Sequence, residues 1–102
     1  MKKIDALTIN INNDNSSVLT KLALYEIRRL AFTAGYNVIE EVVLKIKKIV
    51  ASSYISTSKL DEILKKTRAS NTEILIFNFD LSPTQIRNIK KAVKNIKIID
   101  RT

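Results

Sequence analysis

The side chains of this sequence with the clearest chemical potential are basic, and they fall into two groups. One is a stripe with spacing i, i+3, i+4 and i+7 on a predicted helix: Arg87, Lys90, Lys91 and Lys94. The other is a looser group that precedes it: Lys45, Lys47, Lys48 and Lys59. Clustered lysine and arginine neutralise nucleic-acid phosphates, so we predict that these eight residues bind RNA. The alternative is that the stripe is a solvated helix face and Lys59 a solvated first-turn lysine.

The distribution of charge along the chain supports an acidic partner. The formal net charge is +8, and residues 1–44 contribute nothing to it because they carry five basic and five acidic groups. Residues 45–102 carry thirteen basic and five acidic groups. Such asymmetry indicates a polyanion, most commonly RNA, although a lysine-rich proteome would produce part of it without any such partner.

The residue types that are missing exclude most enzyme chemistry. The chain has no cysteine and no histidine, which excludes thiolate or imidazole zinc sites, disulfides and nucleophilic catalysis by Cys or Ser/His. Its one glycine, Gly35, excludes the Walker-type phosphate loop and the dinucleotide GxGxxG turn, because each needs several glycines near a phosphate. We therefore predict no catalytic residue, no metal site and no enzymatic activity in this chain.

Three polar segments follow predicted strands and could also line a ligand site: 12–17, 53–59 and 78–83. In open α/β sheets, ligands gather beyond the carboxyl ends of the strands. Each segment also has a structural explanation, since Asn, Asp and Ser are the usual residues of turns and helix caps. Asp80 fits a turn better than a catalytic base, and Tyr54 is the aromatic residue best placed to stack on a base.

These residues must be positioned by alternating strands and helices. Apolar periodicity predicts strands at 4–11, 37–50, 72–79 and 96–100, and helices at 17–34, 58–69 and 82–93. Residues 53–56 are predicted to form either a short extra strand or an extended entry to the next helix. This order predicts an α/β fold, a small, mostly parallel sheet of four or five strands with three helices packed on its faces, in a single domain of residues 1–102.

Local signals set the helix boundaries and faces. Ser82 is the predicted N-cap, Pro83 the first helical residue and Gln85 the partner in a capping box, while Leu81 and Ile86 form a hydrophobic staple. Ser16 or Ser17 is expected to cap the first helix, Gly35 to end it, and Ser58 with Asp61 to cap the second. The residues predicted to face inward are Leu19, Leu22, Ala23, Ile27, Leu30, Ala34, Leu60, Ile63, Leu64, Ile86, Ile89, Ala92 and Val93.

Composition indicates a cytoplasmic globular protein. The hydrophobic fraction is 45% and the charged fraction 27%, as in ordinary globular domains. No apolar run approaches the roughly 18 residues of a membrane-spanning helix, and the first residues do not resemble a signal peptide. We predict no contact with a membrane.

Several motifs, in order, resemble the N-terminal α/β subdomain of HflX-type GTPases, which are ribosome-associated members of the translation-factor-like G proteins. They are TAGYNVIEEVV, SYISTSKLDEI, EILIFNFDLSPTQIRNIKKAV and IIDRT, and the resemblance covers about residues 33–102. LSPTQIRN and IIDRT are the specific part. The positions that match the family are Lys59, Ser82, Pro83, Arg87, Asn88, Asp100 and Arg101. Two features depart from it: Ser56 and Ser58 replace the glycines of the family's YIGxGK-like turn, and residues 45–53 lack proline.

The resemblance implies a non-catalytic module that binds rRNA of the large ribosomal subunit and assists docking or subunit splitting. It also implies that a helical hairpin and a GTPase domain are absent from residues 1–102, and that GTP and Mg²⁺ bind in that GTPase domain. The alternative is a regulatory domain that docks on a GTPase domain in cis without RNA contact. A third possibility is a nucleotide-binding domain that uses the strand ends, which a flat ATP or GTP titration would exclude.

Overall fold

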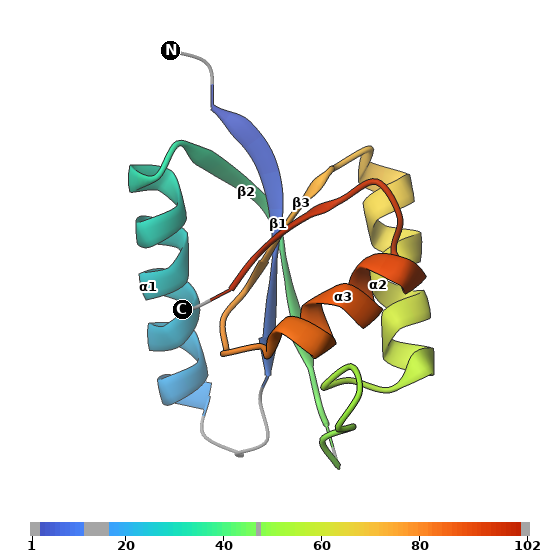
Figure 1. Ribbon diagram of the computed structural model, residues 1–102. Helices are drawn as coiled ribbons and strands as arrows, with labels where there is room; N and C mark the ends of the chain where they lie inside the picture. The colour runs from blue at the N-terminus through green and yellow to red at the C-terminus, as the bar shows by residue number, and fades with distance from the viewer. Residues whose placement is uncertain (1–2, 12–16, 47, 101–102) are drawn as a thin grey trace.

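The computed structural model describes residues 3–11, 17–46 and 48–100, with only the backbone described for 17–20. Its elements along the chain are β1 (Ile4–Ile11), α1 (Ser17–Thr33), β2 (Tyr36–Leu44), α2 (Thr57–Ser70), β3 (Ile74–Phe77), α3 (Pro83–Ala92) and β4 (Lys97–Ile99). Figure 1 shows the sheet seen nearly edge-on, with α1 on one face and α2 and α3 on the other.

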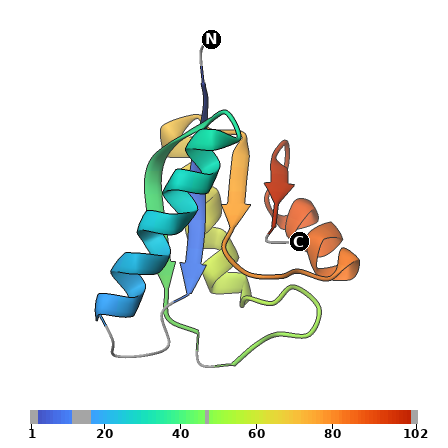
Figure 2. The same ribbon diagram turned by 90° about the vertical axis from the view of Figure 1, so that its left-hand side faces the viewer.

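The sheet has four strands in the order β2-β1-β3-β4, and all three strand pairs are parallel. This arrangement, seen across the strands in Figure 2, confirms the predicted α/β class. Residues 53–56 add no strand to the sheet, because Tyr54 makes only an isolated antiparallel bridge to Val50. Since every strand points the same way, the segments that follow the strands meet at one edge of the sheet.

The second strand ends earlier than predicted. The sequence suggested 37–50, whereas β2 stops at Leu44, so Lys45 and Ile46 lie outside the ladder. Among the described strands its neighbour is β1, and the last pair of their register joins Ile11 to Leu44. The register also shifts once between Ala6 and Leu7, which leaves Ile39 as a bulged residue.

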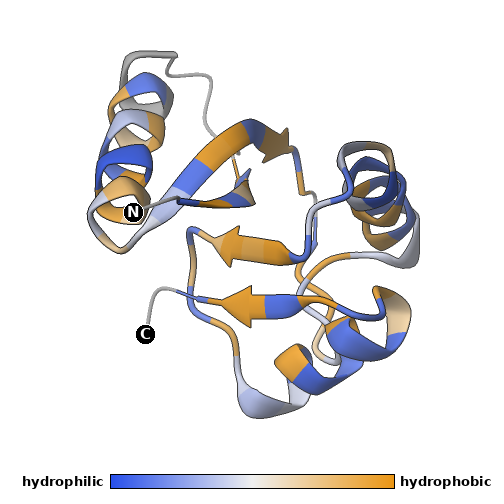
Figure 3. Ribbon diagram, turned by 90° about the horizontal axis from the view of Figure 1, so that it is seen from above, coloured by the Kyte–Doolittle hydropathy of each residue, from blue (hydrophilic) through white to orange (hydrophobic). Residues whose placement is uncertain are grey.

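Two clusters of buried side chains fill the space between the layers. The larger one joins the sheet to α2 and α3 and includes the fully buried Leu7, Ile63, Phe77 and Ile89. The smaller one lies under α1 and consists of Ala6, Ile27, Ala31, Ile74 and Ile76. Figure 3 shows hydrophobic residues along the strands and hydrophilic ones on the outer sides of α2 and α3.

The inward face predicted for α1 is largely wrong. Leu22 and Leu30, expected in the core, are 60% and 59% exposed, and Ala23 and Ala34 are exposed as well. Ile27 is buried as predicted, but its partner is Ala31, one turn further on. No other helix of the described chain lies on this face, so only a narrow stripe of α1 is covered. Leu19 lies outside the residues whose side chains are described.

Helix ends follow the predicted chemistry, with one shift. The Ser82 hydroxyl accepts a hydrogen bond from the Gln85 backbone amide, and the Gln85 side-chain oxygen accepts one from the Ser82 backbone amide, with Pro83 at the start of α3. In α2 the N-cap is Ser56, which accepts from the Lys59 amide at 3.4 Å, and not Ser58. A cap must have extended backbone, and Ser56 does (φ −69°, ψ 162°) while Ser58 is already helical.

The remaining predictions about helices and strands differ in detail. Gly35 follows α1 with φ +98°, and a Cβ there would meet nothing within 4 Å, so backbone conformation alone explains the glycine. The predicted strand 72–79 is shorter, spanning Ile74–Phe77. Leu60 and Ile63 of α2 are buried, as are Ile89 of α3 and Val93, which directly follows α3. Leu64 and Ile86 pack against the same cluster, and Ala92 is exposed.

Ion pairs tie the outermost long strand to helices on both faces. Arg28 of α1 pairs with Glu41, and Lys66 of α2 donates to Glu40 at 2.7 Å. The hydrogen bond from the Lys66 ammonium to Glu40, helped by the charge of that carboxylate, raises the pKa of Lys66 above its usual value. Within the described residues, no helix is both long and apolar enough to cross a membrane.

Candidate nucleic-acid interface

Three of the predicted RNA-binding lysines come together at the carboxyl edge of the sheet. Lys45 and Lys48 follow β2, Lys59 lies in the first turn of α2, and all three line a cavity of about 520 Å³. Ile46, Val50 and Ser56 complete its walls. Lys47, the fourth lysine of this group, lies outside the described residues. We call this cavity, lined by Lys45, Lys48 and Lys59, the lysine cavity.

The position of the lysine cavity adds a helix dipole to its charge. The N-terminus of α2 carries a partial positive charge, and its described first turn contains no acidic side chain to balance it. Lys59 adds a full charge at the same end, and its Nζ lies 3.7 Å from Glu62 in an exposed pair that solvent screens. Charges of one sign concentrated in this way favour a bound anion.

Ser56 and Ser58, which stand where the HflX resemblance implies glycines, have a structural role at this turn. Ser56 caps α2, and its hydroxyl lies 3.1 Å from that of Ser58. The resemblance raised the question of whether a phosphate approaches the backbone here. Instead, the Ser56 hydroxyl accepts a hydrogen bond from the Lys59 backbone amide. This amide of the first helical turn therefore already has a partner within the protein.

Three residues of the second predicted group, Arg87, Lys90 and Lys91, lie on α3, whereas Lys94 follows the helix, which ends at Ala92. Arg87, Lys90, Lys91 and Lys94 are all exposed. The helix has 10 residues and therefore extends about 15 Å. Because α3 follows β3, its first turn lies near the carboxyl edge of the sheet and its last turn near the amino edge. The stripe thus extends away from the lysine cavity, with Arg87 nearest to that edge and Lys94 furthest.

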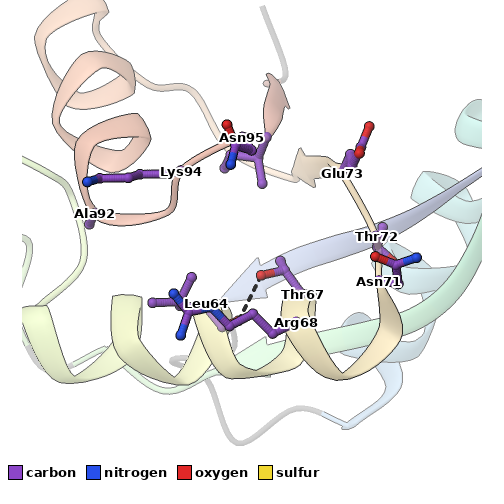
Figure 4. Close-up of a pocket in the computed structure, with 10 residues that line it drawn as sticks. Leu64, Thr67, Arg68, Asn71, Thr72, Glu73, Ala92, Lys94 and Asn95 are labelled. Atoms are coloured by element: carbon purple, nitrogen blue, oxygen red, sulfur yellow. Dashed lines mark hydrogen bonds between the residues drawn. The ribbon is translucent and has the colours of Figure 1, made fainter.

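A separate cavity of about 480 Å³ opens between the C-terminal ends of α2 and α3, and Lys94 lines it. Figure 4 shows Lys94 and Asn95 on one side and Leu64, Thr67 and Arg68 on the other. Glu73 also lines this cavity, so its charge is mixed. The C-terminal ends of two helices carry partial negative charge, which disfavours an anion. This cavity therefore lacks the uniform charge of the lysine cavity.

The loop between the two basic groups is bound to α3. The Asn88 side-chain amide donates to the Ser52 carbonyl at 2.7 Å, and that of Gln85 donates to the Ala51 carbonyl at 3.3 Å. Sequence reasoning gave Asn88 no structural role and Gln85 only a capping role. These two hydrogen bonds join residues 34 and 36 positions apart in the sequence. Periodicity and capping rules concern residues close in the sequence, so they could not predict these contacts.

Tyr54, proposed from the sequence as a base-stacking residue, already stacks on another aromatic ring within the protein. Its ring stacks on Phe79 with centroids 4.5 Å apart and an interplanar angle of 28°. Its backbone is left-handed (φ +72°), which is unusual for a bulky residue. Phe79 in turn contacts Phe77 edge-to-face at 5.5 Å, so the loop is connected to the core through aromatic contacts. The face of Tyr54 that is stacked on Phe79 is not available to a base.

Two asparagines at the strand ends make hydrogen bonds within the fold. Asn10 is buried and donates to Thr8 at 3.1 Å and to the Val42 carbonyl at 3.2 Å, while Asn78 donates to Asn10 at 3.2 Å. Sequence reasoning missed this chain of amides, which links β1 to β2 and to the residue that follows β3. Asp80 is exposed. Segment 12–16 lies outside the described residues. Across the described chain, no three Asp, Glu, His or Cys side chains are grouped as metal ligands.

Comparison with known proteins gives the family. Residues 21–102 match the family described as GTP-binding GTPase N-terminal. The chain is 38% identical over 79 residues to a GTPase HflX of Caldanaerobacter subterraneus subsp. tengcongensis, covering 78% of this chain and 18% of that protein. It is 29% identical over 92 residues to a GTPase HflX of Flavobacterium psychrophilum, covering 90% of this chain and 22% of the relative.

A solved structure shows the same fold. The structure titled crystal structure of SsGBP and GDP complex superposes on 99% of this chain with a TM-score of 0.65 and 24% sequence identity, and this chain covers 26% of it. The present chain thus spans only about a fifth of the length of its HflX relatives, in their N-terminal part. The match over 21–102 confirms the resemblance read from the motifs, and the chain belongs to the N-terminal domain family of HflX GTPases.

Proposed function

We propose that this chain is the non-catalytic, RNA-binding module of an HflX-type protein, acting in the cytoplasm on rRNA of the large ribosomal subunit and assisting docking or splitting. In this proposal GTP and Mg²⁺ bind in the GTPase domain of such a protein and not in residues 1–102. The observation that carries the proposal is the lysine cavity, where three lysines converge at the N-terminus of α2. The exposed α3 stripe extends the same positive charge.

The first test measures the salt dependence of RNA binding. The chain is titrated with a folded fragment of large-subunit rRNA between 50 and 200 mM KCl, with affinity measured by fluorescence anisotropy. We expect log K to fall linearly with log[salt], because each neutralised phosphate releases about 0.7 to 0.9 counterions. Alanine at Lys45, Lys48 and Lys59 should reduce that slope by about 2 to 3, since three phosphate contacts are lost.

A charge-matched variant controls for non-specific attraction. Alanine at Lys21, Arg29 and Lys65, which are also exposed, removes the same net charge from other surfaces and should leave the slope nearly unchanged. Binding that ignores salt, or that weakens equally in both triple variants, contradicts the proposed site.

A second candidate function, docking on the GTPase part of an HflX-type protein, is favoured by an apolar surface around α1. Leu22, Tyr25 and Phe32 are about 60% exposed, as is Leu30. Leu30 also borders a groove of about 220 Å³ whose other walls include Ala31, Tyr36, Ile76, Ile99 and Asp100. Figure 3 shows α1 near β1 and β2, with no described helix directly over β4 on that face. Its proposed occupant is the remaining part of the HflX protein, about four-fifths of the length of the relatives.

Variants separate the two functions. The chain is mixed with the Caldanaerobacter relative from which the matching region has been deleted, and association is measured by calorimetry. We expect Leu30→Lys together with Tyr25→Lys to weaken that association by at least about tenfold, because two apolar side chains that the association would bury become charged. Alanine at Arg87, Lys91 and Lys94 should leave it intact. Absence of association for the unmodified chain contradicts this second function.

A further inference from the structure

The loop from Lys48 to Ser56 is held in place by hydrogen bonds within the loop and by hydrogen bonds to α3. Val50 and Tyr54 exchange two backbone hydrogen bonds, of 3.0 and 2.6 Å, which close a tight turn over 51–53. Ser53 is buried and donates to the Ile55 carbonyl at 2.7 Å, while Ile55 itself is fully buried. The loop is therefore fixed at its base by backbone pairing and by a buried anchor.

Contacts with α3 fix the tip of the same loop. Asn88 and Gln85 donate to the carbonyls of Ser52 and Ala51, so two successive peptide groups of the tip are bound to one helix face. Tyr54 holds a left-handed backbone, which is unfavourable for a residue with a side chain. Stacking on Phe79 and the two bonds to Val50 offset that cost. A strained residue that the surroundings hold in place points to a required shape.

The supported loop lies between the two basic groups. Its N-terminal end carries Lys48, its C-terminal end leads through Ser56 to Lys59, and its tip is bound to the helix that carries Arg87 and Lys91. Its outer surface exposes Ile49 and the small residues Ala51 and Ser52. Fixing this loop fixes the position of the lysine cavity relative to α3.

We propose that Asn88 and Gln85 are positioning residues that hold the two basic groups in one rigid arrangement, and that this rigidity makes the surface selective for folded RNA over flexible single strands. The inference rests on the proposed RNA binding. A folded RNA presents phosphates at fixed positions, so a preorganised set of cations binds it without an ordering cost. A flexible single strand adapts to any arrangement of the same charges, so it gains little from rigidity.

The test compares two RNA ligands and removes no charge from the protein. Asn88→Ala should weaken binding to the folded rRNA fragment about fivefold to tenfold, the equivalent of one hydrogen bond, and change binding to poly(U) of equal length less than about twofold. The salt slope for both ligands should stay the same, because no phosphate contact is lost. Thr84→Ala, at an exposed position on the same helix, is the matched control and should bind both RNAs as the unmodified chain does.

A second variant tests the same shape through the strained residue. Tyr54→Gly removes the ring that stacks on Phe79 while accepting the left-handed backbone, and it should reproduce the selective loss seen with Asn88→Ala. Equal weakening of folded RNA and poly(U), or no weakening in either variant, overturns the role of the loop and leaves RNA binding standing. Salt-independent binding or no binding of either RNA by the unmodified chain overturns both proposals.

Discussion

RNA affinity is expected to fall about a thousandfold at 100 mM salt when both basic groups are neutralised by alanine at Lys45, Lys48, Lys59, Arg87, Lys91 and Lys94. The six substitutions lower the formal net charge from +8 to +2. They remove the three lysines of the lysine cavity and three of the four cations of the α3 stripe. Six lost phosphate contacts should lower the log-log salt slope by about 4 to 5. Filter binding of the same rRNA fragment at several salt concentrations measures both quantities.

The variant with six substitutions combines two triple variants, one in each basic group. Measuring the two triple variants separately shows whether one RNA contacts both groups. Distant sites usually contribute additively, so the free-energy losses of the separate triples should sum to that of the combined variant if both contact the ligand. A combined variant that binds no more weakly than the lysine-cavity triple would show that α3 is only a solvated helix face.

The largest effect on stability is expected for Phe77→Ala. Phe77 is fully buried in the central strand β3 and contacts Phe79 edge-to-face. Removing a buried phenyl ring costs about 3–5 kcal/mol through lost burial and the cavity that remains. That is a large part of the 5–15 kcal/mol that stabilises a typical domain, and it should lower the Tm by about 15–30 °C. Urea and thermal denaturation followed by circular dichroism measure the change.

Phe32→Ala is the matched control because it removes the same side chain from the surface. Phe32 is 58% exposed, and the Lys3 ammonium lies 3.9 Å from its ring centroid. Losing that exposed cation–π contact should cost about 0.5–1 kcal/mol. Comparable destabilisation by the two substitutions would contradict the assignment of Phe77 to the core.

Elements with several local signals were predictable from the sequence. Four signals agreed on the start of α3, because capping, proline preference and the staple all act within a few residues. The apolar run that contains β3 predicted a strand covered on both faces, which the parallel sheet confirms. The family resemblance came from the same locally constrained turns.

Features set by distant neighbours were not predictable. The extent of β2 depends on its pairing with β1, and the buried stripe of α1 depends on how much of the sheet the helix covers. In α1 the apolar residues are distributed around most of the helix, so periodicity allowed more than one inward face. The contacts of Asn88 and Gln85 with the 48–56 loop join segments more than thirty residues apart. Most of the charged residues of the candidate site could be identified from the sequence. The hydrogen bonds that hold them in place could not.

The bulge at Ile39 has a consequence for the behaviour of the chain in crowded solution. β2 is the longest strand, and its outer edge has no neighbour among the described strands, which makes it a template for pairing with another polypeptide. The extra residue breaks the regular spacing of the backbone groups, and Glu40 and Glu41 place carboxylates beside it. We expect this interruption to oppose pairing of an incoming strand along the full length of the edge, and so to oppose amyloid-like association.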